Sequence, residues 1–356
     1  MIRGAGASML VLAAAPMLAV AVTLAFVALA SSPIVALAAG RSDDAPGARG
    51  SASREGSPRT SIEAARRAKQ NYFRDHPFSP LRAFARHDFL PFEPGREPTA
   101  IVGAGEGAEV RLDAPGIPPD LIRITVLNPQ SAGGPYRFRL ERRAPGGDIR
   151  LDGTALAEEG PEATTVVPEE TKIEIGPFAI RPYVQAEAGI LILFDSRRTE
   201  GTLFVAPADF PVDLAWRFRL PLVRVPEPET VRMQTSLGRV KEYRRVGYFE
   251  IDPPPGSGGG GKVRVFAYQP TFAQKKDEAL SILFTDLTTG KETYPAGRYI
   301  DVTPPTDGLY TLDFNAAYNP LCAYTDVYNC PIPPRENALP VAVRAGELDY
   351  RGRKPH

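Results

Sequence analysis

Beyond residue 97 the apolar residues fall into short runs, and this pattern constrains the fold most strongly. Runs rich in Ile, Val, Leu and aromatic residues cover residues 121–128, 136–142, 171–176 and 189–196, with turn-forming Gly and Pro between them. No helical pattern of useful length intervenes, so parallel βαβ units are not expected. The pattern predicts an antiparallel β-sandwich or open barrel over residues 97–221.

A second β block of the same kind is predicted over residues 222–351. It contains two strands joined by a Gly-rich tip at residues 253–261, followed by a strand at residues 279–287. The tip lacks the Lys-Ser/Thr ending and the strand-to-helix context of a phosphate-binding loop. The whole chain has 37 Pro and 32 Gly among 356 residues, a proportion that breaks long helices. The expected fold class is therefore mainly β.

The first 40 residues are typical of an export segment. No charged side chain occurs between residues 4 and 40, and small residues at 28–30 and 36–38 supply A-x-A cleavage sites. The apolar run is also long enough to span a bilayer if it stays uncleaved. We therefore expect residues 1–40 to be a signal peptide or an N-terminal anchor, and the protein to be periplasmic or extracellular. Any membrane contact is expected only through this segment.

A linker and one short helix are predicted next. Residues 41–59 are almost free of apolar side chains, which predicts a disordered linker. Residues 60–96 are expected to form a helix and a lead-in rich in Pro and aromatic residues, because Thr60 and Glu63 have the spacing of a capping box and Pro77 stops the pattern. The predicted packing face carries Ile62, Ala65, Tyr72 and Phe73.

Charge and cysteine content limit the partners, cross-links and metal sites that we expect. Lys plus Arg equals Asp plus Glu at 42 each, so we expect no nucleic-acid partner. Cys322 and Cys330 are the only cysteines, and in an exported protein such a pair predicts one disulfide that clips an irregular C-terminal cap. Reduced thiols or half of a zinc site are the alternatives. No metal site or cofactor is expected.

The C-terminal stretch carries distinctive strings of residues. They are FTDLTTGKETYPAGRY at 284–299, LDFNAAYNPLCAY at 312–324, CPIPPREN at 330–337 and AGE at 345–347. Together they resemble the bacterial family known as domain of unknown function 1684. The resemblance covers roughly the last 140 residues. It implies an exported protein, and it implies neither an activity nor a cofactor.

The same stretch concentrates polar side chains that suggest a site. In LDFN, Asp313 and Asn315 are expected to point together from one face of a strand. Such groups either satisfy the backbone of an irregular loop or line a pocket for a small polar ligand. The candidate ligand-binding residues are Arg298, Tyr299, Asp313, Asn315, Tyr318, Asn319, Glu336, Asn337 and Glu347.

The leading functional hypothesis is therefore an exported binding module for a small polar ligand. A hydrolase that uses two of the carboxylates Asp313, Glu336 and Glu347 is the alternative. A Ca²⁺ site built from Asp313, Asn315, Asn319 and Asp326 is a further possibility, as is an envelope scaffold that binds other proteins. The three histidines lie outside this stretch, which argues against a Ser-His-Asp triad.

Overall fold

The computed structural model describes residues 57–89, 97–128, 135–185, 188–271 and 279–352. Within these residues the protein is mainly β, with one α-helix and several antiparallel sheets, none of which closes on itself. The predicted export segment and nearly all of the predicted linker lie outside the described residues. No described helix has the length and apolar character needed to cross a membrane.

Helix α2 (Pro58–Asp75) begins two residues before the predicted start. Ser57 rather than Thr60 is the N-cap, because its hydroxyl accepts a hydrogen bond from the Thr60 amide at 3.3 Å, while Pro58 occupies the first turn. The helix ends before Pro77, as predicted. Ile62, Tyr72 and Phe73 are buried, whereas Ala65 is exposed. The predicted packing face is thus only partly right.

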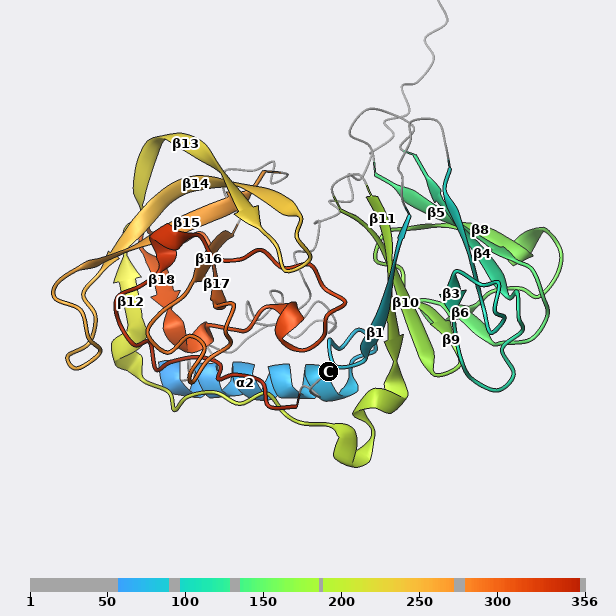
Figure 1. The fold of residues 1–356 in the computed structure, drawn as a ribbon, viewed down its shortest axis with the longest axis horizontal. Helices are drawn as coiled ribbons and strands as arrows, with labels where there is room; N and C mark the ends of the chain where they lie inside the picture. Colours follow the sequence, from blue (N-terminus) through green and yellow to red (C-terminus); the bar gives the residue numbers. More distant parts are fainter. Residues whose placement is uncertain (1–56, 90–96, 129–134, 186–187, 272–278, 353–356) are drawn as a thin grey trace, which may run out of the picture.

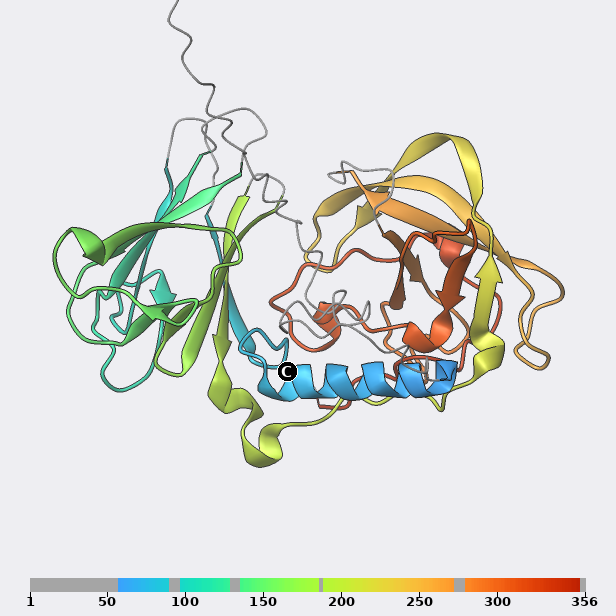
Figure 2. The same ribbon diagram turned by 180° about the vertical axis from the view of Figure 1, so that it is seen from behind.

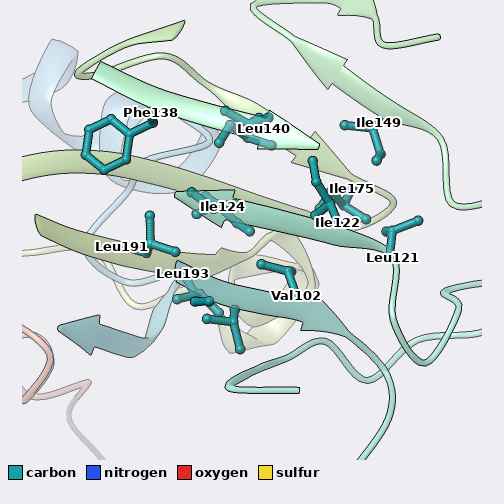
Figure 3. Packing of buried hydrophobic residues seen from close by; sticks show 14 of the residues in the cluster. Val102, Leu121, Ile122, Ile124, Phe138, Leu140, Ile149, Ile175, Leu191 and Leu193 are labelled. Atoms are coloured by element: carbon teal, nitrogen blue, oxygen red, sulfur yellow. The ribbon is translucent and has the colours of Figure 1, made fainter. Parts of the chain in front are cut away.

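The first block consists of two sheets that enclose one apolar core (Figure 3). Phe138, Leu140 and Ile124 face it from one sheet, and Leu191 and Leu193 face it from the other. The six-stranded sheet has the order β1 (Ala83–Phe89), β11 (Ala188–Asp195), β10 (Phe178–Gln185), β9 (Ile173–Ile175), β6 (Ile149–Leu151) and β7 (Thr154–Ala155). The five-stranded sheet has the order β3 (Val110–Arg111), β2 (Thr99–Gly103), β4 (Ile122–Leu127), β5 (Arg137–Arg142) and β8 (Thr164–Pro168). Strand β1 lies in the predicted lead-in, yet it pairs with β11 along its length.

The second block consists of a five-stranded sheet, a two-stranded sheet and a core between them. The five strands are β13 (Val223–Gln234), β14 (Val240–Ile251), β15 (Val263–Pro270), β16 (Leu280–Phe284) and β17 (Arg298–Val302), and β12 (Arg217–Leu220) pairs with β18 (Tyr310–Asp313). The predicted hairpin around the Gly-rich tip is confirmed as β14 and β15. The turn between β13 and β14 at Gly238 was not predicted.

Short 3-10 helices mark the connections and the irregular C-terminal part. They are η1 (Pro161–Ala163), η2 (Ser196–Thr199), η3 (Gly201–Leu203), η4 (Leu214–Trp216), η5 (Phe314–Ala316), η6 (Leu321–Ala323) and η7 (Arg335–Asn337). The two blocks stand side by side, and α2 runs along the second block toward the first (Figures 1 and 2). Near the helix, Phe73 of α2, Phe204 and Tyr324 of the C-terminal region belong to one apolar cluster.

Candidate functional site

Arg298 fastens the C-terminal strap, defined as residues 343–347, to strand β17. Its guanidinium is 1% exposed and donates to the carbonyls of Val343 at 2.8 Å and Ala345 at 2.5 Å, and it forms an ion pair with Asp286 at 3.3 Å. The strap passes close to the residue that follows η5, since a Cβ at Gly346 would lie 2.5 Å from the carbonyl oxygen of Ala317. Gly346 has a φ of +80°, a conformation that favours glycine. Arg298 thus links strand β17 to the strap in the interior of the protein.

Asp313 and Asn315 contact each other, but not from one face of a strand as predicted, because β18 ends at Asp313 and Asn315 lies in η5. Both side chains point toward protein partners. Asp313 caps η5 by accepting from the Asn315 amide at 2.9 Å, and it forms an ion pair with Arg217. The Asn315 side chain bonds to both backbone groups of Asp213, at 2.8 Å each. Both residues are buried. Their polar atoms join strand β18 to the segment that precedes β12.

Glu347 is the centre of a buried network that holds α2. Its carboxylate, 1% exposed, forms an ion pair with Lys69 of α2 at 2.7 Å and accepts from the Tyr324 hydroxyl at 2.8 Å and the Asn319 amide at 2.5 Å. Arg66, one turn earlier in α2, bonds to the carbonyl of Phe210 at 2.7 Å. The helix therefore docks through charged groups as well as apolar ones.

Asn337 replaces a missing piece of sheet between β15 and β16. These two strands pair only at Tyr268 and Ser281. Where they separate, the Asn337 amide accepts from the Phe266 N–H at 2.8 Å and donates to the carbonyls of Phe266 and Leu283 at 2.9 Å each. The fully buried Asn337 side chain thus acts as a peptide group bridging two strands.

Glu336, next to Asn337, is partly exposed and also has protein partners. It accepts from the Tyr268 hydroxyl at 2.5 Å and forms an ion pair with Arg245, which also pairs with Glu229. The structure does not bring the three carboxylates Asp313, Glu336 and Glu347 into one shared cleft. Each is bound to a different cation of the protein.

Tyr299 and Tyr318 lie on the outer face of the five-stranded sheet of the second block. They stand beside a carboxylate that was not among the predicted residues. Their rings meet edge to face with centroids 5.9 Å apart. The Tyr318 hydroxyl donates to Asp301 at 2.5 Å, and the Ser281 hydroxyl donates to the other carboxylate oxygen at 3.1 Å. Burial raises the pKa of Asp301, against the lowering effect of these two hydrogen bonds. All four side chains are partly exposed.

The cysteines are two buried thiols, so the predicted disulfide is wrong. Their sulfur atoms lie 3.4 Å apart, beyond the length of an S–S bond. A hydrogen bond from the Cys330 thiol lowers the pKa of Cys322 to about 7, against the opposing effect of burial. The loop is held by the β13–β14 turn instead, where Ser236 bonds through its amide to the Cys330 carbonyl at 2.9 Å.

A cleft lies where the two blocks meet. It encloses about 480 Å³ and is lined by side chains of β1, by Arg198 of η2, by Leu237 and by residues 325–327. Asp88 at this junction pairs with Arg86 of its own strand at 2.7 Å and with Arg239 of the second block at 3.1 Å. The lining thus combines apolar surface with charges of both signs.

The described residues contain no group of three or more His, Cys, Asp or Glu side chains placed to hold a metal ion. The residues considered for Ca²⁺ are not gathered. Asp313 and Asn315 contact each other, Asn319 bonds to Glu347 and Leu348, and Asp326 lines the cleft.

Asp209 gives the helix-docking network a pH dependence. Burial, together with the nearby charge of Glu347, raises its pKa to about 6 from an ordinary 3.8, against the lowering effect of Arg66. The folded state therefore takes up this proton more readily than the unfolded state. Stability from this group is present below pH 4 and is lost as the pH rises to about 6.

We expect Asp209→Asn to remove this loss. Relative to the variant, the wild type should lose about 2 kcal/mol of unfolding free energy between pH 4 and pH 6. Urea unfolding of both proteins at several pH values measures the difference. Comparing the two proteins is necessary because burial lowers the pKa of His76 to about 4, which works in the opposite direction over the same range. Parallel stability curves for the two proteins would contradict the assignment.

Comparisons with known proteins agree with the sequence resemblance. Residues 203–348 match the family described as "Protein of unknown function (DUF1684)". The solution structure of an uncharacterized protein of Haloarcula marismortui is 35% identical, with 41% of this chain and 77% of that chain covered and a TM-score of 0.34. No curated protein matches.

Two structures of Schizosaccharomyces pombe Nbs1 are also similar over part of the chain. The complex with Ctp1 is 16% identical, covering 31% of this chain and 35% of that chain, and the FHA-BRCT1-BRCT2 domains are 17% identical, covering 31% and 36%. Both TM-scores are 0.20, too low to indicate a common fold. The match over residues 203–348 shows that this part of the chain is a domain of the DUF1684 family.

Proposed function

We propose that the protein binds a small polar ligand in the cleft between the two blocks. The observation that carries the proposal is the cavity itself, about 480 Å³ in volume and lined by both blocks. This volume is in the range of small-molecule sites, which often lie where two structural units meet. Apolar contact from Phe84 and Val327 with flanking Arg198 and Asp326 suits a ligand that carries charge. Export, inferred from residues 4–40, is part of the proposal.

The cleft is favoured over the residues first predicted for the site because those residues already have protein partners. Arg298, Asn315 and Asn337 are at most 2% exposed and bind backbone groups of other segments. A ligand could reach them only after these bonds break, which carries a large free-energy cost. The alternative of a hydrolase gains no support, because Asp313, Glu336 and Glu347 each pair with a different basic side chain.

The test is a thermal-shift screen with a panel of amino acids, sugars and small dicarboxylates at millimolar concentration. A ligand at 100 times its Kd stabilises the folded protein by about 2.7 kcal/mol, so the melting temperature should rise by several degrees. The screen compares wild type with Arg198→Ala. The matched control is Arg197→Ala, since Arg197 is adjacent but pairs with Asp195 and is not part of the lining.

We expect at least one compound that shifts wild type and Arg197→Ala alike and shifts Arg198→Ala clearly less. An Asp326→Asn variant should alter the response to compounds with a positive group. Equal shifts for all four proteins would place the ligand elsewhere. The absence of any shift across the panel would count against binding of these compound classes in the cleft.

A further inference from the structure

Asp301 lies in β17, on the outer face of the five-stranded sheet of the second block. It lies opposite Ser281 in the pairing of β16 with β17, and Ser281 in turn lies opposite Tyr268 of β15. Its neighbours in the strand, Ile300 and Val302, point into the core. The carboxylate therefore stands on the face away from the core, together with Tyr299, two residues earlier in the same strand.

Tyrosine side chains lie beside this carboxylate. Tyr318 donates its hydroxyl to Asp301, and Tyr299 packs edge to face against Tyr318 while its own hydroxyl bonds to the Pro331 carbonyl. Tyr243 lies on the same face, because Tyr243 and Tyr299 pack against the same buried cluster around Tyr268. The ring positions of Tyr299 and Tyr318 are thus fixed by hydrogen bonds, which preorganises the site.

Among the described residues, no basic side chain balances the charge of Asp301. Hydroxyls of Ser281 and Tyr318 supply its hydrogen bonds, and no ion pair joins it to a basic side chain in the described part of the chain. Lys69, whose ammonium lies 5.6 Å from the Tyr318 ring centroid, is paired with Glu347 instead. Within the part of the chain that the structure describes, this partly buried carboxylate has no counter-ion, and its two hydrogen bonds leave some of its lone pairs available.

We propose that Asp301 with Tyr243, Tyr299 and Tyr318 forms a binding site for a small organic ammonium ion. The carboxylate supplies the opposite charge and accepts N–H bonds, and the negative faces of the tyrosine rings attract the cation. This site is separate from the cleft between the blocks and requires no ligand there. All four residues keep part of their surface in contact with solvent.

The experiment is a calorimetric titration of the full chain at fixed ionic strength with two probes, n-butylammonium and tetramethylammonium. Only the primary ammonium can donate hydrogen bonds to Asp301, so the pair of probes separates this contribution from attraction by the rings. n-Butanol serves as the uncharged counterpart of the first probe. We expect saturable binding of n-butylammonium and no comparable binding of n-butanol.

Asp301→Asn should weaken n-butylammonium binding about tenfold or more, because it removes the charge but keeps the shape of the side chain. Tyr299→Leu should weaken binding of both ammonium probes several-fold. The control is Asp307→Asn, because Asp307 is an exposed carboxylate of the same block that pairs with Arg219, and its binding should equal that of wild type. Urea unfolding confirms that each variant is folded. Absence of saturable ammonium binding by wild type, or equal affinity in folded Asp301→Asn, would overturn the proposal.

Discussion

Arg298→Met should lower the free energy of unfolding by about 4 kcal/mol. The substitution keeps most of the apolar part of the side chain but removes the guanidinium, so the carbonyls of Val343 and Ala345 lose their donor. It also leaves the buried Asp286 carboxylate without its cation. Breaking one side of a buried ion pair is costlier than removing both, so most of the loss should come from Asp286. Denaturant unfolding measures it.

Two further variants separate these contributions. Arg298→Lys keeps the charge but lacks the planar fork that reaches several carbonyls at once, so we expect a smaller loss, about 2 kcal/mol. Combining Arg298→Met with Asp286→Asn should cost less than the sum of the two single changes, because the unpaired charge disappears. Strict additivity would show that the two side chains do not interact in the folded protein.

Asn337→Ala should lower the free energy of unfolding by about 3 kcal/mol. The change leaves three buried backbone groups without a partner, namely the N–H and carbonyl of Phe266 and the carbonyl of Leu283. A local signal accompanies the global loss, because the Phe266 amide hydrogen should exchange faster with solvent than in wild type. Hydrogen exchange followed residue by residue therefore distinguishes this mechanism from general loosening.

Asn329→Ala is the matched control for this prediction. Asn329 is also a buried asparagine of the C-terminal region, but its side chain accepts a single described hydrogen bond, from the Leu237 amide at 3.2 Å. We expect a loss of about 1 kcal/mol and no change in exchange at Phe266. If both variants lose the same stability, the bridging role assigned to Asn337 is wrong.

Local patterns in the sequence predicted the local structure well. The strands at residues 122–127, 137–142 and 188–195 appear where short apolar runs predicted them. Asp313 and Asn315 contact each other, but the predicted strand alternation is wrong there, because the chain turns into η5 after Asp313. The spacing of Cys322 and Cys330 correctly indicated proximity, but proximity does not determine whether a bond forms.

Features that depend on distant segments were not predicted. The periodicity of α2 was judged from apolar residues alone, so the docking role of Arg66 and Lys69 was missed. The cleft joins β1 to residues 325–327, and a Thr325 hydroxyl bonds to the Ala83 carbonyl across 242 positions. Nothing local to either segment signals such a contact.

Asp301 was missed although its strand carried a usable signal. In RYIDV the alternation places Ile300 and Val302 on one face, and Tyr299 and Asp301 therefore share the other. A carboxylate beside a tyrosine on the outer face of a strand could have been identified from this alternation. The absence of a counter-ion among the described residues could not be identified in this way, because it depends on which side chains the tertiary fold brings near.

The bridge made by Asn337 affects the order in which the chain can become stable during synthesis. Strands β15 and β16 leave the ribosome before Asn337, which follows Phe266 by 71 residues. Until Asn337 emerges, part of the edge between these strands has no partner, and unpaired strand edges favour association between chains. The second block thus becomes a complete unit only after Asn337 has emerged, and a nascent chain that stalls before Asn337 would be more prone to aggregate than one that stalls after it.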